Sequence, residues 1–207
     1  AFDNSKAMYF IDELNGGSIY KYVSANPNAT NGNDYFAAGQ TFAAMVNGGS
    51  NANAVGAITW APITNATGGA LVGASTVLAD GTIDGRASAN TVGGTDYQRP
   101  EDLQIIGSTL YVAVTEGLGY SGRVLAINLG SMEVSNFVKP GMNALVEDKA
   151  NKVTGFAKVD NLAATPDGKL VMIEDNVPSD IWIATEAHDR DGVAEGIELF
   201  ASLTDPQ

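Results

Sequence analysis

The stretch that decides the fold is residues 103–116, which read LQIIGSTLYVAVTE. Two apolar, β-prone runs flank the pair Gly107-Ser108, and this pattern predicts a β-hairpin with a tight turn. A stretch of the same form, LAATPDGKLVMIE, follows 59 or 60 residues later at residues 162–174. Such an internal echo indicates a repeat architecture, and recurring short antiparallel strands are typical of the four-stranded blades of a β-propeller.

Charged residues stand directly before the first hairpin, in the run YQRPEDLQI at residues 97–105. There Arg99, Glu101 and Asp102 surround Pro100. Proline fixes its own φ and disfavours the helical region for the residue before it, so the sequence predicts an extended Arg99 and a stiff corner. A cation and two carboxylates at such a corner could build a site for metals and an anion, or could be solvated charges at a turn.

The second hairpin carries acids at both of its ends. Asp160 stands just before it, and Glu174 and Asp175 close it. In a propeller the strand ends converge on the axial channel, so acids far apart in sequence can meet there. Because calcium takes six to eight oxygen ligands, we expect Glu101 and Glu174 to help hold one shared cation site. The alternative is that each is an ordinary turn acid.

The rest of the chain carries weaker strand signals. Residues 7–12 and 18–23 alternate as a hairpin across a loop rich in Asn and Gly, and residues 56–63 form a strand candidate that ends near Pro62. Residues 80–94 are predicted to be an extended surface loop. A short helix is expected within residues 140–150.

Composition limits the classes of function. The chain has 207 residues, 44% of them hydrophobic, a net charge of −13 and no cysteine. This length can bury a core, and no apolar run is long enough to span a membrane. The acidic charge opposes nucleic-acid binding and favours cations. Without cysteine there is no disulfide, thiol nucleophile or thiolate metal site.

Two further segments bear on chemistry. The single histidine, His188, lies in an acidic stretch without a serine motif, so it is interpreted as a surface residue and a Ser-His-Asp mechanism is not expected. Residues 189–195, DRDGVAE, have the D-x-D-G pattern of a calcium loop, but the full EF-hand spacing is absent. They could equally form a plain acidic turn.

Taken together, these motifs resemble the PhoX-type bacterial alkaline phosphatase family. The resemblance rests on RPED at 99–102, DNL at 160–162, PDGKL at 166–170 and ED at 174–175, and it extends to residues 8–13, 17–22 and 57–63. It implies an all-β, PhoX-like β-propeller. Blades of roughly 40–50 residues would make residues 1–207 a partial ring of about three to four blades. We therefore expect a single propeller segment, completed by a missing segment or another chain.

The resemblance also implies a site. Glu101 would coordinate metal and Arg99 would contact the phosphate, while the further metal ligands would be Glu13, Asp160, Glu174 and Asp175. The family's centre combines calcium and iron, and a cysteine takes part in it. Because this chain has no cysteine, calcium is the expected cofactor, and iron is expected only if an upstream segment contributes.

Two functions follow as alternatives. The first is a calcium-dependent phosphomonoester hydrolase segment, with a phosphate ester or inorganic phosphate as ligand. The second is a non-catalytic calcium-binding surface or assembly protein on the same scaffold. Arg99 favours the first, because structural calcium needs no arginine, whereas the missing cysteine favours the second. Either protein is expected to be bacterial and secreted, periplasmic or at the cell surface.

Overall fold

The computed structural model describes residues 1–47, 53–115, 122–148, 150–151, 153–186 and 191–203, which fold as two compact units. The N-terminal unit comprises residues 1–12 and 16–97, and the C-terminal unit comprises residues 13–15 and 98–207. The chain passes between them in two short strands, β2 (Asn15–Gly17) and β8 (Tyr97–Gln98).

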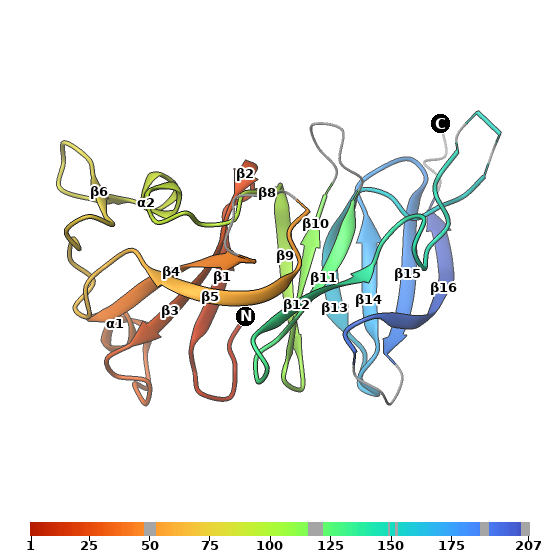
Figure 1. The fold of residues 1–207 in the computed structure, drawn as a ribbon. Coiled ribbons are helices and arrows are strands. Elements are labelled where there is room, and N and C mark those ends of the chain that lie inside the picture. Colours follow the sequence, from red (N-terminus) through yellow and green to blue (C-terminus); the bar gives the residue numbers. More distant parts are fainter. Residues whose placement is uncertain (48–52, 116–121, 149, 152, 187–190, 204–207) are drawn as a thin grey trace. The chain divides into compact units, whose positions relative to one another are not determined.

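The N-terminal unit is built on a four-stranded antiparallel meander (Figure 1). Its strands are β1 (Met8–Ile11), β3 (Ile19–Ser24), β4 (Gly39–Val46) and β5 (Gly56–Pro62), and they lie in that order. The register of β1 on β3 places Met8 opposite Tyr22 and Ile11 opposite Ile19, which confirms the predicted hairpin. Tyr20, Ala43, Ile63 and Ala89 form a buried cluster on this sheet.

Residues 80–94 are more ordered than the predicted surface loop. They contain β7 (Ile83–Asp84), which pairs with β6 (Thr76–Val77), and the helix α2 (Gly85–Thr91). The expectation of a loop was wrong because it overlooked a helix cap: the Asp84 side chain accepts a hydrogen bond from the Ala87 amide at 2.9 Å. A second short helix, α1 (Gly32–Tyr35), follows the cap residue Asn31.

The C-terminal unit contains two four-stranded antiparallel meanders, drawn in green to teal and in blue in Figure 1. The first consists of β9 (Pro100–Ile106), β10 (Thr109–Val114), β11 (Arg123–Asn128) and β12 (Glu133–Val138). The second consists of β13 (Val159–Ala164), β14 (Leu170–Glu174), β15 (Ser179–Glu186) and β16 (Ala194–Leu203). Both contribute to one buried core, in which Tyr111 and Phe137 of the first meander join Met172 and Trp182 of the second.

The two echoing stretches fold into equivalent hairpins, as predicted. In β9–β10 the turn pairs Ile106 with Thr109, and in β13–β14 it pairs Ala164 with Leu170. Gly107 and Gly168 adopt φ values of 61° and 84°, a left-handed conformation that glycine tolerates at these turns. The similar patterns of the two sequences therefore reflect a structural repeat.

The expected helix within residues 140–150 is not formed in the part of that segment which the structure describes. Isolated bridges join Pro140 to Ala144, Val146 to Phe156 and Asp148 to Val153 instead. The Asn143 side chain ties down the start of the segment, since it accepts from the Lys139 amide at 3.0 Å and donates to the Phe137 carbonyl at 2.7 Å. Side-chain bonds of this kind compete with helical ones.

No helix within the described ranges has the length and apolar character needed to cross a lipid bilayer.

Candidate metal and phosphate site

Arg99 links β8 to β9, and its backbone is left-handed, with φ at 49°. The prediction of an extended Arg99 was therefore wrong. Proline disfavours the right-handed helical region for this residue, yet the left-handed region remained open, and two hydrogen bonds hold it there. The Arg99 amide donates to the Leu14 carbonyl at 3.1 Å, and the Arg99 carbonyl accepts from the Thr115 amide at 3.0 Å. A non-glycine residue with positive φ is strained, and such strain is concentrated at functional sites.

The Arg99 guanidinium is paired with two carboxylates of the same unit. Its Nη2 lies 2.6 Å from Oε1 of Glu101 and 3.6 Å from Oε1 of Glu13. The Glu101 side chain is only 5% exposed, whereas those of Arg99 and Glu13 are 39% and 61% exposed. Arg99 thus has one buried partner that fixes it and a part of its surface that solvent, or a ligand, can reach.

Asp160 and Asp175 extend this group of acids. Burial raises the pKa of Glu101 to about 7; Arg99 lowers it, while the charges of Glu13 and Asp160 raise it further. Burial also raises the pKa of Asp160, followed by repulsion from Asp175 and Glu13. Four predicted metal ligands and the predicted phosphate contact therefore interact electrostatically. We call these five residues, Glu13, Arg99, Glu101, Asp160 and Asp175, the acidic corner.

Irregularities in two hairpins lie beside Glu101 and Asp160 of the acidic corner. The register of β9 on β10 shifts between Val112 and Val114, opposite the stretch from Pro100 to Leu103 that contains Glu101. The register of β13 on β14 shifts between Val159 and Asn161, which flank Asp160. A bulge turns a side chain away from the regular alternation of the strand, and bulges are common beside active sites.

Asp102 connects the two irregular strand starts. Its Oδ1 accepts from its neighbour Leu103 at 2.7 Å, and its Oδ2 accepts from the Leu162 amide at 2.8 Å. Leu103 and Leu162 are the first residues of the two echoing sequences. From the sequence, Asp102 was one of the two carboxylates at the corner that could build a metal site. In the structure it links β9 to β13 through the Leu162 amide.

Glu174 belongs to a different set of contacts in the C-terminal unit. It is 2% exposed, and its Oε1 accepts from the Ala157 amide at 2.8 Å and from the indole Nε1 of Trp182 at 2.9 Å. Its other oxygen, Oε2, is buried without a hydrogen-bond partner. Burial raises its pKa to about 7, and the nearby charge of Asp180 adds to this. The sharing of one cation by Glu174 and Glu101 therefore stays a prediction.

The raised pKa values of Glu101 and Glu174 predict a pH dependence of stability for the chelated protein. Both are raised from 4.5 to about 7, so the folded state binds more protons than the unfolded state between these values. The contribution of these two glutamates to the stability of the fold is therefore greatest below about pH 4.5. It is lost as the pH rises through about 7. In EDTA we expect the melting temperature to fall by at least about 3 °C from pH 5 to pH 8.

Glutamine at either position should flatten this slope, because an amide does not titrate. Glu198→Gln, at an exposed position of β16, is the matched control and should leave the slope unchanged. A melting temperature that rises from pH 5 to pH 8 in the chelated protein would contradict the argument. Melting curves recorded by circular dichroism at four pH values are sufficient.

The donor chemistry of the acidic corner suits a hard cation. Within the described ranges, no three acidic or histidine side chains are arranged so that they could together hold a metal ion. The corner offers only oxygen ligands: Glu13, Glu101 and Asp160 interact with the Arg99 guanidinium, and Asp175 repels Asp160. Repulsion among carboxylates is the kind that a bound cation relieves. By donor chemistry, though not yet by their arrangement in the described ranges, these residues suit calcium, which prefers such oxygens, and offer no thiolate to a softer metal.

Some sequence-based predictions fall outside the described residues. The structure does not describe Glu116, the last residue of the first hairpin's pattern. It also does not describe His188 or the first two residues of the D-x-D-G stretch. The remainder of that stretch is described: Asp191 accepts from the Val193 amide at 2.8 Å, and Gly192 donates to Oε1 of Glu186 at 2.8 Å.

The bulged, repeated hairpins and the antiparallel meanders define an all-β protein of the β-propeller class. Comparison with known families and structures agrees. A family model described as alkaline phosphatase PhoX matches residues 2–198, and the chain therefore belongs to the PhoX family. The predicted family is thereby confirmed.

A solved structure gives the same fold. Pseudomonas fluorescens PhoX, in complex with the transition-state analogue vanadate, superimposes with a TM-score of 0.67 and 18% sequence identity. The match covers 99% of this chain and 43% of that one, so the chain spans less than half the length of this relative. It confirms the predicted all-β, PhoX-like fold. Comparison with curated proteins finds no significant match.

Proposed function

We propose that this chain is a segment of a calcium-dependent phosphomonoester hydrolase and that the acidic corner is its metal and phosphate site. The observation that carries the proposal is the pair of Arg99 and Glu101, joined at 2.6 Å at the bulged start of β9. The pair lies among further carboxylates in a chain of the PhoX family. The complex of the Pseudomonas relative with vanadate supports a phosphate-like ligand.

Arg99 would bind the phosphate through hydrogen bonds. A guanidinium carries five N–H donors in a planar fork that matches phosphate oxygens, and the pairing with Glu101 occupies the fork from one side. Because the side chain is 39% exposed, donors remain accessible to a ligand. Glu101 therefore acts as a positioning residue for Arg99, and the hydrogen-bonded left-handed backbone fixes the base of the side chain.

Glu13, Glu101, Asp160 and Asp175 would hold the cation. Calcium bound there would neutralise negative charge on the phosphoryl oxygens, which is the largest obstacle to attack on a phosphate ester. The acids are buried to different extents, and Glu13 is mainly exposed, so the site would be open to solvent on that side. We also propose a secreted, periplasmic or cell-surface location, which membership of the PhoX family and the acidic, cysteine-free composition support.

Calcium titration of the chelated protein tests the proposal. We expect calcium at 100 times its dissociation constant to stabilise the fold by about 2.7 kcal/mol, visible as a higher melting temperature. Glu101→Gln should reduce this rise, whereas Glu198→Gln, on an exposed part of β16, should not. Glu174→Gln then tests whether Glu174 shares the site.

Hydrolysis of p-nitrophenyl phosphate, measured with and without calcium, separates the two functions. Turnover that EDTA abolishes and calcium restores supports the hydrolase. Stabilisation by calcium without turnover selects the non-catalytic calcium-binding protein, which the absence of cysteine also favours. If calcium neither stabilises the protein nor supports turnover, both proposals are wrong.

A further inference from the structure

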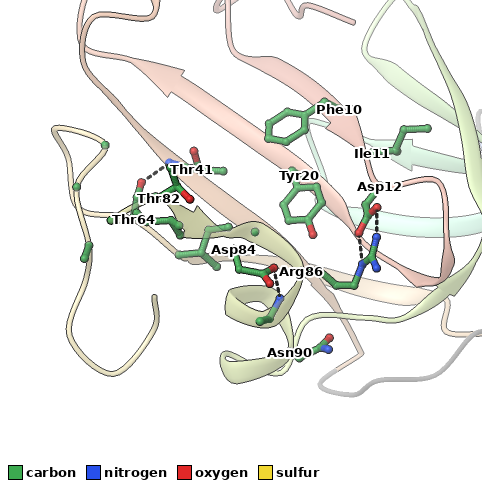
Figure 2. Close-up of a pocket in the computed structure, with 18 residues that line it drawn as sticks. Phe10, Ile11, Asp12, Tyr20, Thr41, Thr64, Thr82, Asp84, Arg86 and Asn90 are labelled. Carbon is green, nitrogen blue, oxygen red and sulfur yellow. Dashed lines mark hydrogen bonds and ion pairs between the residues drawn. The ribbon is translucent and has the colours of Figure 1, made fainter. Parts of the chain in front are cut away.

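A large pocket lies within the N-terminal unit and uses none of the residues of the acidic corner. It has a volume of about 920 Å³ and is lined by residues of β1, β3, β4, β7 and α2 together with the connections around them (Figure 2). Pockets that bind small molecules commonly have volumes of about 300–1,000 Å³. The size therefore suits a small organic ligand.

One wall of the pocket is aromatic. Phe10 of β1 and Tyr20 of β3 are opposite each other in the strand register, and their rings stack with centroids 5.0 Å apart and an interplanar angle of 14°. Tyr20 is buried, whereas Phe10 is only partly buried and also lines the pocket. Burial raises the pKa of Tyr20 to about 12, so its hydroxyl stays neutral and can both donate and accept hydrogen bonds.

Charged groups are held rigidly beside this wall. Arg86 of α2 donates from Nε and Nη2 to the two oxygens of Asp12, at 2.5 and 2.6 Å. Asp84 is fixed separately by the Ala87 amide. Figure 2 shows the hydroxyl of Tyr20 directed toward the Asp12–Arg86 pair, with Asp84 close by. These side chains are held in place before a ligand arrives, which reduces the entropy cost of binding.

The charge of the pocket restricts the class of ligand. Two carboxylates face one guanidinium, so the pocket is negative on balance and opposes phosphates and other anions. The paired ions still carry unused lone pairs and N–H donors, which suit neutral hydroxyl groups. Thr64, Thr82 and Asn90 add further polar atoms around the pocket.

We propose that this pocket binds a neutral sugar. A pyranose ring has an apolar face of C–H groups, which packs against an aromatic ring, and a rim of hydroxyls, which pair with planar charged side chains. Phe10 supplies the ring face, and Asp84 and the Asp12–Arg86 pair contact the hydroxyls. The phosphate-ester site proposed above involves other residues, so the two proposals can fail independently.

Isothermal titration calorimetry of the whole chain tests the proposal. The probes are glucose, galactose, maltose and cellobiose, with glucose 6-phosphate as the anionic comparison and tetramethylammonium as the cationic one. We expect at least one neutral sugar to bind with a dissociation constant of about 1 mM or below. Glucose 6-phosphate should bind more weakly than glucose, and tetramethylammonium should not compete.

Two variants and two matched controls locate the site. Phe10→Ala should weaken sugar binding by about tenfold, and Asp84→Asn, whose side chain still caps α2, should weaken it by about fivefold or more. Phe36→Ala and Asp34→Asn alter exposed residues of the same unit outside this pocket and should change the affinity less than about twofold. Failure of all neutral sugars to bind, preference for either charged probe, or binding that Asp84→Asn leaves unchanged would overturn the proposal.

Discussion

Replacing Glu174 with alanine is expected to lower the free energy of unfolding by about 2–5 kcal/mol, because two buried donors lose their acceptor. The Ala157 amide and the Trp182 indole both donate to Oε1 of Glu174, and Trp182 lies in the core of the C-terminal unit. Each unsatisfied buried group costs about 1–3 kcal/mol. The truncation also leaves a cavity beside Trp182, which adds to the loss.

Glu174→Gln separates the hydrogen bonds from the charge. The amide oxygen of glutamine can accept from both donors, so this variant should retain most of the stability at pH 5. At pH 8 it should equal or exceed the chelated wild type, since burial of the ionised carboxylate is then avoided. Urea denaturation at both pH values measures this. Glu198→Ala, an exposed change in β16, serves as the control. An effect of Glu174→Ala no larger than that of this control would refute the argument.

The second large effect is expected at Arg99, and it rests on the proposed hydrolase function. Arg99→Ala should reduce kcat/KM for p-nitrophenyl phosphate by about 10²–10³, the range found when a preorganised donor to a developing anion is removed. Arg99→Lys should recover only a small part, because a lysine ammonium cannot form the planar bidentate contact. The measurement is made on the calcium-loaded protein.

The control for Arg99 is Lys169→Ala, which removes an exposed cation that is paired with Asp167 at 3.3 Å. It changes the net charge equally and should leave kcat/KM within about twofold. Inorganic phosphate should also inhibit the Arg99 variants less than the wild type. If Arg99→Ala and Lys169→Ala reduce kcat/KM equally, the effect is one of net charge, and Arg99 does not contact the phosphate.

Much of the fold could be predicted from the sequence because strand patterns are local. The hairpins at β1–β3, β9–β10 and β13–β14 each have a turn signal between β-prone runs, and all three were predicted. The helix α2 was missed because its signal is a single capping aspartate, Asp84, within a stretch of polar residues. Arg99 was assigned the wrong conformation because its left-handed backbone depends on Leu14 and Thr115, which lie far from it in sequence.

The acidic corner was predicted through resemblance more than through spacing. Glu101 and Asp160 stand beside strand starts, which is visible in the sequence, but the bulges beside them are not. The sugar pocket could not be predicted, since its central ion pair joins Asp12 to Arg86 across 74 residues. The only local indication of a pocket was that Phe10 and Asp12 stand two residues apart at the end of a strand. Many exposed strands have the same alternation of an apolar and a polar residue.

The contact between Trp182 and Glu174 gives the C-terminal unit an optical reporter. Indole emission responds to charge at the ring nitrogen, and here that nitrogen donates to a carboxylate whose pKa lies near neutrality. The chain has two tryptophans, and Trp60 belongs to the N-terminal unit, so Trp60→Phe leaves Trp182 as the single tryptophan, which can be excited selectively over the tyrosines. The protonation of one buried acid can then be followed in solution without any added label.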